Sequence, residues 1–409
     1  MAEIKTWNIT KTPTSEYVAR RKRLYDKLAA AKADAVIVYS DKEMRYLSGS
    51  MCMQLERPMA LVITVDGRTA MLGPRLEKEH MEDHVQMVDK FYIYDEYPGL
   101  IGCIETLADI IKDMGLSHGT IIASHSTYPP ICGGRYPDLV NFLPDIKLVI
   151  DPYFVYDLKI IKSEFDIHCI RECSRWGSMA LTELTSITHP GVVEPEITGI
   201  AAGKTTAAML KCLGMEFDAK TLNNGIARAS AGYRGQFAER GAMPHCVTTT
   251  QPFPDHGPLV SGAGANILEY NSELERTHFL GEPTPEMIKY FNHAVECQEL
   301  IFNTIRPGIT CADVDKVTRS YYEENGLMNC WRHHTGHSVG MDNVGHEYPY
   351  LDAGLTDVVI EPGMVFSVEP GFYVEGLGGF RFSDTIAVTE TGIEILTYYP
   401  RDIEHLLVY

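Results

Sequence analysis

The stretch that most constrains this chain is 332–349, which reads RHHTGHSVGMDNVGHEYP. It places histidines among glycines, at His333, His334, His337 and His346. Imidazole is the one side chain whose ordinary pKa lies near neutrality, so such a cluster suits proton transfer or metal binding. A polar surface loop is the plainer interpretation of any single histidine. The whole cluster, followed by the carboxylate-bearing run EPGMVFSVEPG at 361–371, favours a functional site.

The composition indicates a protein that acts on small molecules. A chain of 409 residues with 45% hydrophobic residues can form two or three packed domains. Its formal net charge of −19 argues against binding to nucleic acid or anionic lipid, since phosphates require basic patches. The N-terminal residues lack the apolar core of a signal peptide, and no apolar run of about eighteen residues occurs. We therefore expect a soluble, cytoplasmic protein without membrane or nucleic-acid partners.

The ten cysteines are scattered, and no C-x-x-C pair occurs among them. Zinc knuckles and redox dithiols are therefore not predicted, and the thiols are expected to be reduced and mostly buried. Cys246 is an alternative nucleophile because it follows His245, although neighbours on an extended segment point to opposite faces.

Hydrophobic periodicity divides the chain into two regions with a boundary near residue 158. The first, 1–158, alternates helix-like and strand-like segments, with a helix over about 15–33 and strands at 35–39 and 59–64. The second, 159–409, begins with a helix whose N-terminal cap is Ser163. Further helices are expected over about 193–213, 284–305 and 311–325, and strands near 243–249, 265–280, 364–374 and 379–389. This order indicates an α+β chain whose second domain combines helices with an antiparallel sheet.

The strand predicted around NSELERTH, residues 271–278, carries an acidic face. Period-two geometry places Glu273, Glu275 and Thr277 on one face of this strand. His278 belongs to the opposite face. Two carboxylates on one face repel each other unless a cation, a metal or a proton lies between them. Ordinary surface acids on a solvent-facing strand are the alternative interpretation.

From about residue 160 the chain contains the motifs IIKSEFDIHCIR, MPHCVTT, LERTHFLG, the H-x-x-G-H-S-V-G and H-E-x-P pair, EPGMVFSVEPG and GGFRFSDTIAVTETG. On these motifs the C-terminal half resembles the pita-bread fold of methionine aminopeptidase, aminopeptidase P, prolidase and creatinase. The N-terminal half is similar to the ribonuclease H-like domain of creatinase and prolidase, with ERPMALVIT as the matching segment. The resemblance to peptidase family M24 implies an α/β N-terminal domain followed by a pita-bread catalytic domain.

Peptidases of this family hold two divalent metals with two Asp, one His and two Glu. By resemblance, the Asp positions fall on Gly262 and Glu273, the His position on His337, and the Glu positions on Glu369 and Ser383. Gly and Ser cannot bridge two dications, because such ions need anionic oxygen or imidazole donors. We therefore expect no metal cofactor. A single Mn, Zn or Fe ion bound by Glu273, His337 and Glu369 is the alternative.

Creatinase is the metal-free branch of the family, and its LERT sequence is matched here at 274–277. By this resemblance Glu275 and Glu369 would hold and polarise the substrate. His245 would act as general base on a water and then return the proton to the leaving nitrogen. Where creatinase has a second arginine, this chain has Leu351, which puts creatine itself in doubt.

The remaining expected substrate-binding residues come from both halves of the chain. Arg57, with Leu55 before it in LERP, would bind a substrate carboxylate. Glu273, His337 and His346 would line the same site. A homodimer is expected, because creatinase-like proteins complete each active site with the ERPM segment of the partner chain.

The sequence therefore predicts a metal-independent, creatinase-like hydrolase that cleaves a C–N bond of a small, carboxylate-bearing amidino or amide substrate. Two alternatives stay open. One is a metal-dependent Xaa-Pro peptidase or lyase of the same fold, which the retained His337, Glu369 and HEYP motif favour. The other is a catalytically inactive binding protein, which the acidic composition and lost ligands would allow.

Overall fold

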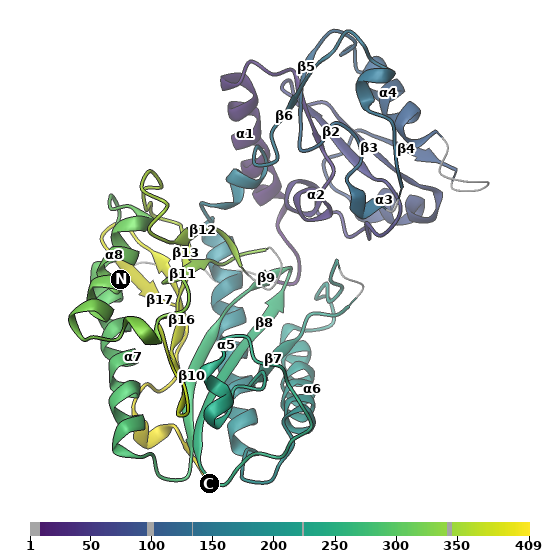
Figure 1. The fold of residues 1–409 in the computed structure, drawn as a ribbon. Coiled ribbons are helices and arrows are strands. Elements are labelled where there is room, and N and C mark those ends of the chain that lie inside the picture. The colour runs from purple at the N-terminus through teal and green to yellow at the C-terminus, as the bar shows by residue number, and fades with distance from the viewer. Residues whose placement is uncertain (1–8, 96–101, 133, 223–224, 342–345) are drawn as a thin grey trace, which may run out of the picture. The chain divides into compact units, whose positions relative to one another are not determined.

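The computed structural model describes residues 9–95, 102–132, 134–222, 225–341 and 346–409 (Figure 1). The chain divides into two compact units. The N-terminal unit comprises residues 11–159 and 220–226, and the C-terminal unit includes residues 160–219 and 227–409. Each unit has its own sheet, and each is described by itself below.

The N-terminal unit is built on a six-stranded mixed sheet in the order β4-β3-β2-β1-β5-β6. The central strand β1 pairs antiparallel with β2 and parallel with β5. Both β1 and β2 are buried along their whole length, as expected of apolar strands covered on both faces. The strands are β1 (Ala35–Val38), β2 (Ala60–Thr64), β3 (Thr69–Pro74), β4 (Lys90–Tyr94), β5 (Thr120–Ala123) and β6 (Lys147–Ile150). The helices are α1 (Thr14–Ala30), α2 (Asp41–Ser48), α3 (Lys78–His84) and α4 (Cys103–Asp113).

The C-terminal unit contains a ten-stranded sheet whose main path runs β12-β11-β13-β16-β10-β8-β7. The ladders that join β8, β10, β16 and β13 are all antiparallel. The first strands along the chain are β7 (Ala229–Gly232), β8 (Gly257–Ile267), β9 (Tyr270–Asn271), β10 (Leu274–Leu280), β11 (Gly336–Ser338) and β12 (Glu347–Leu351). They are followed by β13 (Val365–Val368), β16 (Ser383–Val388), β17 (Ile393–Ile395) and β18 (Leu407–Val408). Strands β14 (Gly371–Val374) and β15 (Gly378–Arg381) form a separate two-stranded sheet.

Two pairs of helices pack on this unit: α5 (Glu164–Ser186) with α6 (Glu194–Leu213), and α7 (Pro285–Thr304) with α8 (Cys311–Glu324). Helices α5 and α6 contact β7 and β8, and Figure 1 shows the long strands β8 and β10 between the two pairs. Helix α5 begins at a capping box in which the Ser163 hydroxyl accepts from the Asp166 backbone N–H. Thr310 and Asp313 form the same box at α8. These local signals place the helices where the sequence predicts them.

The predicted strand at 243–249 is wrong. This segment follows a short 3-10 helix, Ala238–Ala242, and forms turns without a strand ladder. The Arg240 side chain donates to the Val247 carbonyl at 2.7 Å, and the Gln236 amide donates to the Met243 carbonyl at 3.3 Å. These side chains satisfy the backbone carbonyls locally, so the segment does not need a neighbouring strand.

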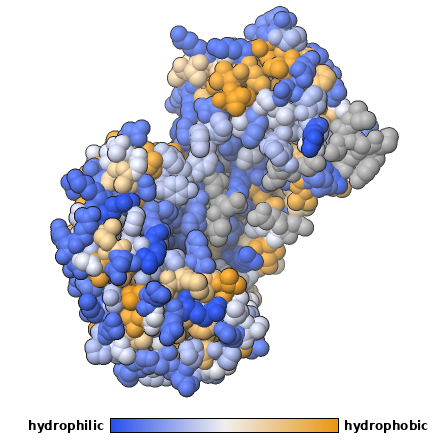
Figure 2. Space-filling model, viewed as in Figure 1, coloured by the Kyte–Doolittle hydropathy of each residue, from blue (hydrophilic) through white to orange (hydrophobic). Residues whose placement is uncertain are grey.

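Figure 2 shows a mainly hydrophilic face of each unit, with apolar residues exposed in places. None of the helices in the described ranges is long and apolar enough to cross a membrane. The ten cysteines are free thiols, and all except Cys212 and Cys246 are buried, as the sequence predicts.

Candidate active site

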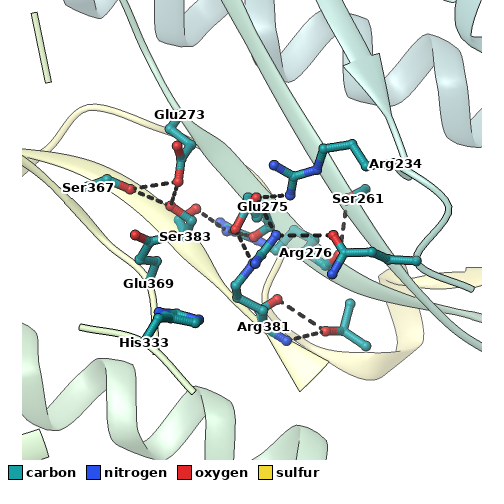
Figure 3. A network of polar contacts seen from close by, with 12 residues as sticks. Arg234, Ser261, Glu273, Glu275, Arg276, His333, Ser367, Glu369, Arg381 and Ser383 are labelled. Atoms are coloured by element: carbon teal, nitrogen blue, oxygen red, sulfur yellow. Dashed lines mark hydrogen bonds and ion pairs between the residues drawn. The ribbon is translucent and has the colours of Figure 1, made fainter. Parts of the chain in front are cut away.

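Polar side chains converge where four neighbouring strands of the C-terminal sheet meet. Strand β10 carries Glu275 and is preceded by Glu273, while β11 carries His337. Strand β13 is followed by Glu369, and β16 begins with Ser383. Since β11, β13, β16 and β10 are consecutive in the sheet, residues distant in sequence become neighbours. Figure 3 shows Glu273, Glu275 and Glu369 grouped around Ser383.

One imidazole nitrogen lies between two of these carboxylates. The Nε2 atom of His337 is 3.4 Å from Glu273 Oε2 and 3.5 Å from Glu369 Oε1. His337 is fully buried, and its Nε2 atom has no hydrogen-bond partner among the described residues. His346 stacks on His337 with ring centroids 3.8 Å apart, and its own Nε2 is 3.5 Å from Glu273 Oε2. The histidine cluster and the acidic strand of the sequence therefore belong to one site.

The second nitrogen of His337 determines the tautomer. Nδ1 lies 3.0 Å from the Ser338 carbonyl oxygen, which can only accept, so Nδ1 must donate its proton there. In the neutral ring the lone pair of Nε2 then points toward the two carboxylates. A lone pair facing two anions is unfavourable unless a proton or a metal ion lies between them. Donation from Nδ1 to a backbone carbonyl is the arrangement that orients metal-binding histidines.

The pKa values of these groups reflect a surplus of negative charge. Burial, together with the neighbouring Glu273, raises the pKa of Glu369 to about 8. Burial alone would lower the pKa of His337, but Glu273 and Glu369 raise it to about 9. For Glu273, burial opposes ionisation, but the charge of His337 outweighs it and holds the Glu273 pKa well below its ordinary value. The site therefore favours a bound cation.

Glu273 is also held by two serines. The hydroxyl of Ser367 donates to Glu273 Oε1 at 2.9 Å, and that of Ser383 donates to the same oxygen at 2.8 Å. Oε1 is thus engaged with hydroxyls, and Oε2 faces His337 and His346. Figure 3 shows the hydrogen bonds of one Glu273 oxygen with the two serines, and the other oxygen remains for the histidines.

Two arginines bracket Glu275. Arg381 Nη2 donates to Glu275 Oε1 at 2.7 Å and pairs through Nε with Oε2, and Arg234 Nη2 also pairs with Oε1 (Figure 3). Arg381 Nη1 donates to the Tyr373 hydroxyl at 2.9 Å, and that hydroxyl lies 2.8 Å from His333 Nε2. Burial and the Arg381 charge lower the pKa of His333 to about 3, so His333 is a neutral member of this network.

A buried ion pair supports the two stacked histidines. Lys162 Nζ lies 2.9 Å from Glu347 Oε2 and donates to the Ser338 hydroxyl at 2.9 Å. Both charged side chains are only 2% exposed. Ser338 follows His337, and Glu347 follows His346, so Lys162 ties together the strands β11 and β12 beside the histidines. At Gly336 a Cβ would come within 2.0 Å of the Ser367 carbonyl oxygen, which explains the glycine before His337.

Contacts within the C-terminal unit do not bring the other predicted site residues into this cluster. His245 is exposed on a turn, and no hydrogen bond or ion pair joins its side chain to another described residue. Its assignment as general base stays a prediction. Leu55 and Arg57 belong to the N-terminal unit, where Leu55 is half exposed and Arg57 pairs with Glu56.

Sequence reasoning missed Arg234, Arg381 and Lys162 as members of the site. Arg381 could have been found, because it stands in the GGFR motif two residues before Ser383. Arg234 stands in no motif and joins the site only through folding. Lys162 is 185 residues from its partner Glu347, and nothing in the local pattern of either residue predicts that pairing.

Comparisons with known proteins identify the family. A profile described as metallopeptidase family M24 matches residues 168–390, more than half of the chain, and the creatinase/prolidase N-terminal domain profile matches residues 20–129. The chain belongs to metallopeptidase family M24. The expected architecture, a creatinase/prolidase-type N-terminal domain and a pita-bread domain, is thereby confirmed. The expected enzyme class, a hydrolase acting on C–N bonds, is confirmed as well.

Relatives and solved structures agree over nearly the whole chain. An uncharacterised peptidase of Staphylococcus aureus strain MSSA476 is 26% identical over 386 residues, which are 93% of this chain and 99% of the relative. The Xaa-Pro dipeptidase from Bacillus anthracis has 24% identity and a TM-score of 0.77, covering 96% of this chain and 100% of its own. The prolidase from Pyrococcus horikoshii OT3 has 22% identity and a TM-score of 0.73, covering 94% and 99%. At these identities the two structures support the fold.

Membership of a metallopeptidase family overturns two expectations, namely catalysis without metal and the absence of a metal cofactor. The argument from sequence counted the ligands lost at Gly262 and Ser383 and gave too little weight to those retained. The tertiary structure brings Glu273, His337 and Glu369 together around an imidazole nitrogen without a partner among the described residues. The ligand atoms of Glu273, His337 and His346 all lie within 4.8 Å of one another, and Glu369 lies beside His337, so this cluster suits a divalent ion.

Proposed function

We propose that this protein is a metal-dependent peptidase that hydrolyses Xaa-Pro bonds in short peptides. The structural neighbours support this substrate class, since those from Bacillus anthracis and Thermotoga maritima are named Xaa-Pro dipeptidase and X-Pro aminopeptidase. The observation that carries the metal dependence is the buried Nε2 atom of His337, which faces Glu273 and Glu369 at 3.4 and 3.5 Å.

The residues present fit a divalent ion by their chemistry. Glu273 and Glu369 provide anionic oxygens and His337 an imidazole nitrogen, which are the donors that Mn, Zn and Fe ions accept. Three protein ligands with an open position are typical of a catalytic rather than a structural site. His346 contributes a further imidazole next to Glu273.

When bound, such an ion would polarise the scissile carbonyl and lower the pKa of an attacking water. The protein orients the ligands in three ways. Ser367 and Ser383 hold Glu273 through one oxygen, and the Ser338 carbonyl sets the tautomer of His337. Lys162 joins the side chains of Ser338 and Glu347, the residues that follow the two stacked histidines.

The decisive experiment combines metal content with activity. Protein purified with Mn²⁺ should hydrolyse Ala-Pro much faster than Ala-Ala, lose activity on chelation and regain it when Mn²⁺ is restored. Glu273→Gln should lose bound metal and activity together, because it removes an anionic ligand. Glu394→Gln, which changes a surface carboxylate paired with Arg171, is the matched control and should keep both. Full activity after exhaustive chelation would contradict the proposal.

We also propose that the protein acts as a homodimer in which Arg57 of one chain, next to Leu55, completes the active site of the other. The basis is the family resemblance of the ERPM segment. Arg57→Ala should then raise KM more than it lowers kcat, since it removes binding of the substrate carboxylate. Mixing Arg57→Ala with Glu273→Gln subunits should restore part of the activity. Absence of such rescue after demonstrated subunit exchange would refute the shared site.

A further inference from the structure

Three residues lie in one row across the sheet at the centre of the site. Glu275 on β10 is paired with Gly262 on β8 on one side and with Ser383 on β16 on the other. Directly opposed residues of antiparallel strands project to the same face. Gly262 and Ser383 are also the two positions at which the family resemblance places ligands that this chain lacks. The two lost ligands therefore flank Glu275.

The Arg234 guanidinium fills the space above Gly262. A Cβ at Gly262 would lie 3.0 Å from Cζ and 3.1 Å from Nη2 of Arg234. Even a Cβ at this position would require the guanidinium to shift by a few tenths of an ångström, and a longer side chain would require more. The glycine at 262 therefore leaves room for a cation at a position where the family resemblance places an anionic ligand.

The loop that carries Arg234 is built to hold it there. Arg234 has φ +54°, in the left-handed region that non-glycine residues seldom adopt, and Gly235 follows with φ +74°. Buried Glu194 accepts hydrogen bonds from the backbone N–H groups on both sides, Tyr233 at 3.1 Å and Gly235 at 2.8 Å. Such a conformation is unfavourable by itself and persists only where the surroundings enforce it, which is common at functional sites.

The guanidinium also remains accessible. The Arg234 side chain is 49% exposed, and Glu275 is its only hydrogen-bond or ion-pair partner among the described residues. Arg381, by contrast, is buried and spans Glu275, Tyr373 and Gln236. Arg381 is therefore a positioning residue, whereas Arg234 has N–H donors left for a substrate oxygen.

The charges at the site match one metal ion better than two. Glu273, Glu275 and Glu369 lie within one cluster and carry three negative charges when ionised. Arg234 and Arg381, which both pair with Glu275, add two positive charges to this group. A single dication leaves this group with a small net charge, whereas a second would place a large excess of positive charge in a buried site, where charge is costly.

We propose that the Arg234 guanidinium stands in for the second metal ion of the family's site, so that each chain binds one divalent cation and Arg234 supplies the other positive charge to the substrate. The proposal rests on the function proposed above. In it, Arg234 donates to the carbonyl oxygen of the scissile bond as negative charge develops there, a role that positioned hydrogen-bond donors perform.

The test measures metal stoichiometry and kinetics separately. Metal-free protein titrated with Mn²⁺ in a calorimeter should bind one ion per chain, and Glu273→Gln should bind none. Arg234→Ala should still bind one Mn²⁺, yet its kcat on Ala-Pro should fall by about a hundredfold or more, the scale expected for loss of a preorganised donor. Added guanidinium ion should restore part of that kcat, which a purely structural role would not allow.

Arg171→Ala is the matched control. Arg171 is also an arginine of the C-terminal unit with one carboxylate partner, Glu394, and it is 39% exposed, but it lies outside the site. This variant should keep wild-type stoichiometry and kcat. If Arg234→Ala does not fold, Arg234→Lys tests the same point, because it keeps the charge but loses the planar fork and should lower kcat at least about tenfold.

Two results would overturn the inference while leaving the proposed function intact. One is binding of two Mn²⁺ ions per wild-type chain, both lost in Glu273→Gln. The other is a folded Arg234→Ala variant with undiminished kcat. Wild-type protein that binds no Mn²⁺ and keeps its activity after chelation would instead refute the proposed function itself, so the two failures are distinguishable.

Discussion

Replacement of Lys162 by Met tests whether the buried ion pair supports the site. Lys162 and Glu347 are each 2% exposed and lie 2.9 Å apart, so removing the ammonium leaves the Glu347 carboxylate buried without that partner. Breaking a buried pair in this way typically costs about 3–5 kcal/mol of unfolding free energy. For a unit of this size, that corresponds to a melting temperature lower by about 6–20 °C.

The assay is urea denaturation followed by the fluorescence of Trp176 and Trp331, which both lie in the C-terminal unit. Lys204→Met is the matched control, because Lys204 pairs with Glu183 in the same unit with its side chain 66% exposed. An exposed pair of this kind contributes about 0–1 kcal/mol. Lys162→Met should also weaken Mn²⁺ binding by about 10–100-fold, the usual effect of losing a group that supports metal ligands.

The double variant K162M/E347Q separates charge from packing. It removes the buried carboxylate charge as well, so it should recover a large part of the stability that Lys162→Met loses. This recovery would appear as a coupling energy in a double-mutant cycle. The reasoning is refuted if Lys162→Met destabilises no more than Lys204→Met, or if the effects at Lys162 and Glu347 simply add.

Three further predictions concern pH, packing and the two carboxylates of β10. Burial lowers the pKa of His278 to about 3, so between pH 6.5 and 3 the unfolded chain binds a proton that the folded chain does not. The free energy of unfolding should therefore decrease as the pH is lowered, by about 2 kcal/mol from this group between pH 7.5 and 5. Urea midpoints measured at both pH values should show a smaller loss in His278→Leu. Gly336→Ala should strongly reduce the yield of folded protein, because its Cβ would meet the Ser367 carbonyl oxygen at 2.0 Å. Gly199→Ala in α6, where nothing lies within 4 Å of the added Cβ, should raise the free energy of unfolding by about 0.5–1 kcal/mol, measured by urea denaturation. Glu275→Gln should keep its Mn²⁺, measured by metal analysis, yet lower kcat through loss of the charge that holds Arg234; loss of Mn²⁺ would make Glu275 a ligand instead.

Local sequence patterns were sufficient for much of the fold. The capping boxes at Ser163 and Thr310 mark the starts of α5 and α8, because they depend only on residues three positions apart. The alternation in LERT places Glu275 and Thr277 on the site face of β10, where Glu275 meets Arg234 and Arg381. The strand predicted at 243–249 did not form, since Arg240 and Gln236 from outside the segment each donate a hydrogen bond to one of its backbone carbonyls.

The sequence by itself determined the family, the pita-bread domain and most of the candidate ligands, because these depend on motifs and on their spacing along the chain. Only the tertiary structure decided which charges meet. Gly262 reads as a lost ligand in the sequence, but in the folded protein it is the space into which Arg234 fits. Such contacts depend on sheet register and on a loop held by Glu194, both of which join residues far apart in the chain. No local periodicity encodes them, so the electrostatic character of the site follows from packing.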